Sequence, residues 1–177
     1  MFSLAVRATL AAVLLVAAAG KVGTRTRFAA FGAWVGTLPI PFARAPMLPV
    51  LAVALEALIA CCLVPPATAP FALPASAALF VVFAATAARV GRAGLEIDCH
   101  CFGTARGRLG RMHVWRDAVL AAAGLTSALT GFLRIGGRSG PGESCAFIVV
   151  GLLLAGFVVS LENLLALLRG HARYSSR

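Results

Sequence analysis

Charged residues are scarce in this chain of 177 residues, and acidic residues are the scarcest of them. Only 12% of the residues are charged, whereas an average soluble domain carries roughly 25%. Hydrophobic residues make up 60% of the chain, and the mean hydropathy is +0.93. A chain of this size with so little charge cannot cover its apolar surface in water. The composition therefore excludes an ordinary soluble domain and favours a membrane protein.

A basic stripe for nucleic acid is also missing, although 16 Lys and Arg against 6 Asp and Glu give a net charge of +10. The arginines lie at the ends of apolar runs, which suits anionic headgroups and topology signals. We expect membrane lipid, and no nucleic acid, among the partners. The first apolar run lacks the basic segment of a cleavable signal peptide, so we expect it to be retained as a span.

Five apolar runs predict an all-α fold, a polytopic transmembrane helical bundle of four core spans plus a fifth in a single domain. The expected spans are at about residues 2–20, 47–64, 71–90, 114–133 and 145–168. The segment of about residues 26–40 is too short and too interrupted by Gly and Pro to span. Its Phe28, Phe31, Trp34 and Leu38 share one helical face. They predict an interfacial helix anchored by Trp34.

Positive charge is shared unevenly between the two sides of these spans. The loops after the first and third spans, with the C-terminus, hold Lys21, Arg25, Arg27, Arg44, Arg89, Arg92, Arg106, Arg108, Arg111, Arg169, Arg173 and Arg177. The other side holds Arg7, Arg134 and Arg138. The positive-inside rule places the first side in the cytoplasm of a cell membrane (inner or plasma membrane), with the N-terminus outside.

The loop before the fourth span carries the string Asp98-Cys99-His100-Cys101. A disulfide between residues i and i+2 closes a strained ring, and strained disulfides exchange readily. Arg116 and His100 would favour the thiolate, and Asp98 could accept a proton during exchange. These residues predict a redox-active thiol pair, which the charge distribution places at the cytoplasmic face.

A metal site is the alternative for the same loop. Cys99, His100 and Cys101, with Met112 or His113 nearby, offer soft ligands for Cu(I) or Zn(II). Adjacent residues seldom all point at one ion, and the paired C-x-x-C signature of zinc is absent. Both interpretations, and that of two inert thiols, stay open from the residues alone.

The three other cysteines, Cys61, Cys62 and Cys145, fall at the opposite ends of their spans from this loop. We interpret them as small apolar residues of buried helices. The alternative is that the two groups of thiols pass reducing equivalents across the membrane.

Glu56 lies in the middle of the second span. A charge there costs about 2.5–3.5 kcal/mol on insertion scales, so it must be paired, protonated or functional. The structural interpretation is a helix-packing hydrogen bond to Thr9, Thr86, Thr126 or Ser127. The functional interpretation is a proton site or a contact to a quinone headgroup.

Arg116 and Asp117 begin the fourth predicted span. We interpret them as a snorkelling arginine and a helix-starting acid; the alternative is that Arg116 tunes the thiols. His113 and His171 are expected at the membrane interface rather than in catalysis.

The order of these residues resembles the MauE family, within the wider group of MauE/DoxX-type redox-associated membrane proteins. The likeness covers about residues 2–133. It rests on Gly20-Lys21, Glu56, the string "DCHCFG" from Asp98 to Gly103, and Arg116-Asp117. Two positions depart from the family pattern: His100 stands where Gly is usual, and Asp117 stands where Asn is usual.

The resemblance implies a small helical membrane protein that works with a thioredoxin-like, MauD-like partner. The family's namesake supports maturation of methylamine dehydrogenase, in which disulfides form in a periplasmic subunit. We therefore expect a thiol–disulfide redox protein that supports maturation of an extracytoplasmic client, in a pathway such as methylamine utilisation. The alternatives are a non-enzymatic metal-binding or scaffolding assembly factor and, from Glu56 alone, a transporter.

Overall fold

Helices account for nearly all of the chain that the computed structural model describes, which is residues 2–40, 43–95, 111–133 and 145–160. They are α1 (Phe2–Val22), α2 (Arg25–Val35), α3 (Met47–Leu63), α4 (Ala69–Arg92), α5 (Arg111–Phe132) and a sixth helix, Cys145–Ser160. No strand occurs within these ranges. The all-α prediction is confirmed.

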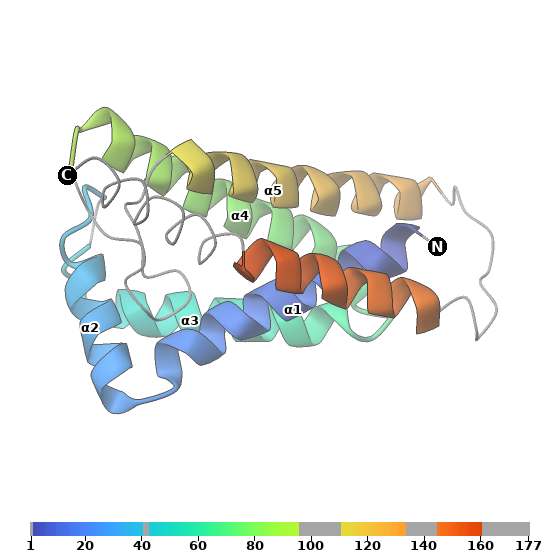
Figure 1. The fold of residues 1–177 in the computed structure, drawn as a ribbon, viewed down its shortest axis with the longest axis horizontal. Coiled ribbons are helices and arrows are strands. Elements are labelled where there is room, and N and C mark those ends of the chain that lie inside the picture. Colours follow the sequence, from blue (N-terminus) through green and yellow to red (C-terminus); the bar gives the residue numbers. More distant parts are fainter. Residues whose placement is uncertain (1, 41–42, 96–110, 134–144, 161–177) are drawn as a thin grey trace, which may run out of the picture.

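Five of the helices run lengthwise and alternate in direction, and α2 lies across one end of them (Figure 1). We call this end the α2 end. It holds the last turns of α1 and α4 and the first turns of α3 and α5. The helix Cys145–Ser160 begins at the opposite end. The main pairings are α1 with α3 and α4 with α5, and α1 also packs on α5.

The turns between helices follow from their residues. Thr24 starts α2, because its hydroxyl accepts a hydrogen bond from the backbone N–H of Arg27 at 3.2 Å. After α3, Thr68 donates to the carbonyl of Cys62 at 2.5 Å. Pro70 lies in the first turn of α4, where a missing N–H costs nothing. Pro74 is accommodated inside α4.

The core of the bundle is mainly apolar, but it also holds several polar side chains, while many large apolar side chains are exposed. The buried polar residues are Thr9, Lys21, Glu56, Ser76, His113, Asp117 and Ser127. By contrast Leu58, Val119 and Leu153 are each at least 60% exposed. So many exposed large apolar side chains are unfavourable in water, and a bilayer favours them.

Two helices, Ser3–Val22 and Ala69–Arg92, are long and apolar enough to cross a membrane. Met47–Leu63 and Cys145–Ser160 are apolar but shorter. The helix α5 has 22 residues but is not among these candidates; it carries Arg111, Arg116 and Asp117. Membrane crossing by five helices stays a prediction. The expected fifth span, 145–168, extends past residue 160 and so beyond the described residues.

The helix Cys145–Ser160 lies against α1 through small residues. A Cβ at Gly151 would lie 2.6 Å from the carbonyl oxygen of Ala5 and 2.8 Å from the Cβ of Ala8. The hydroxyl of Thr9 donates to the carbonyl of Gly151 at 3.1 Å. Glycine allows this close approach, as in small-residue contacts between membrane helices.

Within α2 and the turn that follows it, Phe31 and Leu38 are buried and Trp34 is partly buried. The rings of Phe31 and Trp34 stack with centroids 5.9 Å apart. Leu38 joins Ala87 and Val90 of α4 in a small cluster, and Trp34 packs against it. Trp34 therefore packs partly against the protein, and its expected role as a membrane anchor stays a prediction.

Candidate functional site

The most buried charged group of the described residues is Glu56, on α3. Its side chain is 1% exposed, and both carboxylate oxygens accept hydrogen bonds from the Nζ of Lys21 on α1, at 2.6 and 2.8 Å. The Lys21 side chain is only 5% exposed. Two opposite charges thus neutralise one another inside the bundle, and their hydrogen bonds join α1 to α3.

An aromatic ring completes the surroundings of the ammonium group. The Nζ of Lys21 lies 5.3 Å from the ring centroid of Phe31, on α2. This distance is within the range of a cation–π contact, which is strongest where water is excluded. Lys21 is also the only lysine among the 16 basic residues. A compact ammonium with three donors suits a site that has two oxygens and a ring face.

The hydroxyls expected to pair with Glu56 do not do so. Thr9 donates to the carbonyls of Ala5 and Gly151. Thr86 and Thr126 donate to carbonyls of their own helices. The hydroxyl of Ser127 has no hydrogen-bond partner in the part of the chain that the structure describes. That expectation is wrong because the register of α1 against α3 brings a lysine to the acid.

A second acid, Asp117 on α5, is 2% exposed. The Nε of Arg116 donates to its Oδ1 at 2.8 Å, and the Arg116 side chain is 11% exposed. The expected snorkelling arginine and helix-starting acid are therefore incorrect. The helix α5 begins at Arg111, more than a turn before Asp117, so this carboxylate lies inside the bundle rather than at a helix start.

His113 lies one helical turn before Asp117 and is 7% exposed. Residues i and i+4 share one face of a helix, so both side chains belong to the buried face of α5. His113 therefore lies inside the bundle near the start of α5, and its position relative to a membrane interface stays a prediction. Its spacing from Asp117 was the signal that could have placed it inside.

Four of the predicted site residues, Asp98, Cys99, His100 and Cys101, lie outside the described residues. The described chain stops at Leu95 and resumes at Arg111, at the start of α5. Both flanks belong to the α2 end (Figure 1). The flanks of the cysteine loop thus share one end of the bundle with Arg116 and Lys21, whereas the site residues themselves are not placed.

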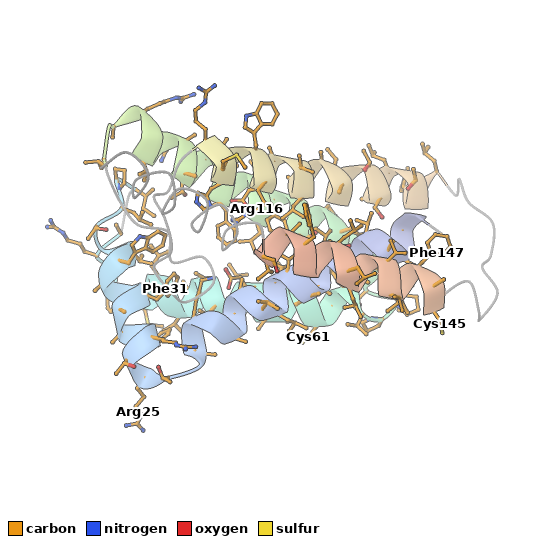
Figure 2. All side chains as sticks on the ribbon, viewed as in Figure 1. Arg25, Phe31, Cys61, Arg116, Cys145 and Phe147 are labelled. Atoms are coloured by element: carbon orange, nitrogen blue, oxygen red, sulfur yellow. The ribbon has the colours of Figure 1, made fainter. Side chains whose placement is uncertain are left out.

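The remaining cysteines, Cys61, Cys62 and Cys145, are free thiols. Cys61 and Cys62 are in the last turn of α3, and Cys62 packs against the main core. Figure 2 shows Cys145 at the end of the bundle away from Arg25. These three thiols therefore lie at the opposite end of the bundle from the flanks of the cysteine loop, as the sequence predicted.

The described groups can neutralise charge and hold or transfer a proton, because two carboxylates and an imidazole are kept from water. No three His, Cys, Asp or Glu side chains come together as a metal site within ranges 2–40, 43–95, 111–133 and 145–160. The metal alternative at Cys99, His100 and Cys101 lies outside those ranges. Sequence reasoning missed Lys21, although a lone lysine and a lone mid-span acid are complementary in charge.

Comparison with known proteins adds one match. The family described as "Methylamine utilisation protein MauE" matches residues 1–134, about three quarters of the chain. No curated protein and no solved structure matches significantly. The match includes Lys21, Glu56, the cysteine loop, Arg116 and Asp117, and the helices α1 to α5. The chain therefore belongs to the MauE family of methylamine utilisation proteins.

Proposed function

We propose that this protein is a membrane thiol–disulfide redox protein in which Cys99 and Cys101 form the exchanging pair. Membership of the MauE family carries the proposal, because it associates the chain with methylamine utilisation, where an enzyme subunit must be matured. The α2 end supports it, since the flanks of the cysteine loop share that end with buried ionisable groups. A thioredoxin-like protein is the proposed partner.

The reaction is a two-electron exchange. The Cys99–Cys101 disulfide is attacked by a thiolate of the thioredoxin-like partner, and a mixed disulfide forms. The second thiol of that protein displaces the remaining cysteine, so its own disulfide forms and Cys99 and Cys101 become two thiols. Two electrons and two protons have then passed to this protein. A quinone that accepts these two electrons and two protons, and becomes a quinol, would restore the disulfide.

The other proposed residues act on protons and charge. Arg116 and His100 would favour the attacking thiolate by placing positive charge near it. Asp98 would accept a proton during exchange. Glu56 would carry protons to or from the quinone, with Lys21 as the cation that balances its charge.

Thiol trapping tests the proposal. Membranes are quenched with acid at defined redox poise, and free thiols are alkylated with a mass-adding maleimide. We expect Cys99 and Cys101 to shift together between a disulfide and two thiols, and we expect Cys99→Ser to trap a mixed disulfide through Cys101. The matched control, Cys61→Ser with Cys62→Ser, should leave that pattern unchanged.

Three results would contradict the proposal. One is that Cys99 and Cys101 stay reduced at every poise. Another is that client maturation survives the double change Cys99→Ser and Cys101→Ser, which would favour a scaffolding factor. The third is stoichiometric Cu or Zn in the purified protein that is lost with Cys99→Ser, which would favour a metal site.

A further inference from the structure

An open groove runs along the seam between α4 and α5. It encloses about 700 Å³, within the roughly 300–1,000 Å³ typical of ligand sites. Its lining is apolar and consists mainly of alanines, of which Ala78, Ala85, Ala118 and Ala122 are exposed. Because alanine side chains end at Cβ, the two helices leave a long furrow beside their contact rather than a filled surface.

Two arginines continue this groove at the α2 end. The groove includes Ala88 on α4 and Val114 on α5, and the two helices are antiparallel, so these residues mark the same end of it. Arg92 follows Ala88 by four residues, and Arg111 precedes Val114 by three. Residues three and four apart share a helix face, so both arginines lie on the groove face. Both are exposed.

No acidic group offsets this charge in the described part of the chain. Its two acids, Glu56 and Asp117, are 1% and 2% exposed and face the interior. The exposed charged residues at the α2 end are Arg25, Arg27, Arg44, Arg89, Arg92 and Arg111. The mouth of the groove therefore presents positive charge beside an apolar furrow.

We propose that the groove between α4 and α5 binds an anionic phospholipid, with its phosphate at Arg92 and Arg111 and one acyl chain along the alanines. An anionic head joined to an apolar tail is the chemistry that this arrangement complements. One leaflet is about 15 Å deep, half of a hydrocarbon core of about 30 Å. The rise from Ala88 to Ala78 is also about 15 Å, at 1.5 Å per residue.

The arginines distinguish this ligand from other apolar occupants. A quinone has a neutral ring and gains little from two exposed cations. A helix of a second copy would fill the furrow with side chains, and the arginines of both copies would have to approach one another if the pairing were symmetric. The proposal is independent of the redox chemistry of Cys99 and Cys101, so either can fail without the other.

Native mass spectrometry of the full chain, released from detergent micelles, tests the proposal. The probes are phosphatidylglycerol, phosphatidylcholine with the same acyl chains, and inorganic phosphate. We expect retained phosphatidylglycerol, less phosphatidylcholine and no phosphate. With Arg92→Gln and Arg111→Gln together, affinity for phosphatidylglycerol should fall about 30-fold, roughly five-fold for each arginine. The matched control is Arg25→Gln with Arg27→Gln, which removes equal charge from α2 at the same end.

A second variant tests the acyl-chain site. Ala85→Leu with Ala118→Leu should fill the groove and reduce phosphatidylglycerol binding, whereas Ala54→Leu with Ala75→Leu adds the same volume at exposed positions outside the groove lining and should not. The proposal would be overturned if phosphatidylglycerol and phosphatidylcholine were retained equally and the Arg92→Gln, Arg111→Gln variant retained them as well as the unchanged protein does. Displacement of the lipid by ubiquinone, or a dimer that disappears when the groove is filled, would also overturn it.

Discussion

Lys21 stands on the last turn of α1, with its ammonium group between the Glu56 carboxylate and the Phe31 ring. It therefore touches α2 and α3 as well as belonging to α1. A buried ion pair adds little stability compared with well-packed apolar residues, but removal of one partner leaves a charge without compensation. The pair consequently behaves as a unit, and single substitutions report on it very differently from a double one.

Lys21→Met alone, or Glu56→Leu alone, should lower the free energy of unfolding by about 3–5 kcal/mol, because one buried charge loses its partner. The double variant should recover most of this loss. The measurement is denaturation in detergent micelles followed by circular dichroism, analysed as a double-mutant cycle. Additive losses would show that the two residues do not stabilise the fold as a pair.

The same variants separate structure from chemistry at Glu56. If this carboxylate carries protons in the redox cycle, the double variant should fold normally yet turn over slowly, in an assay of client disulfide formation. Recovery of both stability and turnover would leave the ion pair a packing role only.

Arg7 holds α1 to α3 at the other end of the bundle. Its guanidinium donates to the carbonyls of Leu63 and Val64, at 2.9 and 2.5 Å, where α3 ends. A cation at a helix C-terminus stabilises by on the order of 1 kcal/mol. Arg7→Gln should cost about that much in the same unfolding measurement, and Arg44→Gln, an equal charge change, should cost less. Equal losses of unfolding free energy for the two variants would show that Arg7 does not specifically cap the C-terminus of α3.

At the residue scale, the sequence indicated that Glu56 needs a partner but not which one. The sequence offers four hydroxyl groups and one lysine as possible partners of Glu56. Only the packing of α1 against α3 selects the lysine. The interior position of His113 and Asp117 was missed for a related reason. Hydropathy starts the span at residue 114, whereas the helix starts at Arg111 and includes the polar residues Arg111 and His113.

At the scale of elements, Gly151 is the glycine of the described ranges at which an added Cβ would come closest to another helix, α1. Gly151→Ala would place a methyl group 2.6 Å from the carbonyl oxygen of Ala5. We expect the helix Cys145–Ser160 to move away, with a loss of about 1–3 kcal/mol. Unfolding and limited proteolysis would measure it.

Gly156→Ala is the control on the same helix, because a Cβ there meets nothing within 4 Å. It should leave stability unchanged or raise it, since alanine favours helix more than glycine does. Similar losses for both variants would mean that the helix responds to any added methyl group, and not to the contact with α1.

The helices themselves were the most predictable elements, because long apolar runs bounded by Pro, Gly and Arg leave few alternatives. The sequence also placed a short helix near residues 26–40, and α2 spans Arg25–Val35. What could not be predicted was its environment. Phe31 and Trp34 look alike in a periodic pattern, and tertiary packing decides that the Phe31 ring is buried whereas the Trp34 ring is only partly covered.

For the molecule as a whole, the α2 end gathers nearly all the described positive charge, which supports an orientation with that end in the cytoplasm. In a background with the other cysteines changed to Ser, an impermeant maleimide added to intact cells should label Cys145 but not Thr26→Cys. Labelling after permeabilisation is the control for reactivity. The opposite pattern would place the α2 end, and the flanks of the cysteine loop, outside.

The hydrogen bond from Thr9 to Gly151 joins residues 142 positions apart. During synthesis α1 is made long before the helix Cys145–Ser160, so the surface formed by Ala5, Ala8 and Thr9 lacks this partner until most of the chain has been made. Closing so distant a contact is slow. The contact between α1 and the helix Cys145–Ser160 therefore forms late in assembly. A ribosome that stalls before residue 145 would leave this surface of α1 accessible to a chaperone or a protease.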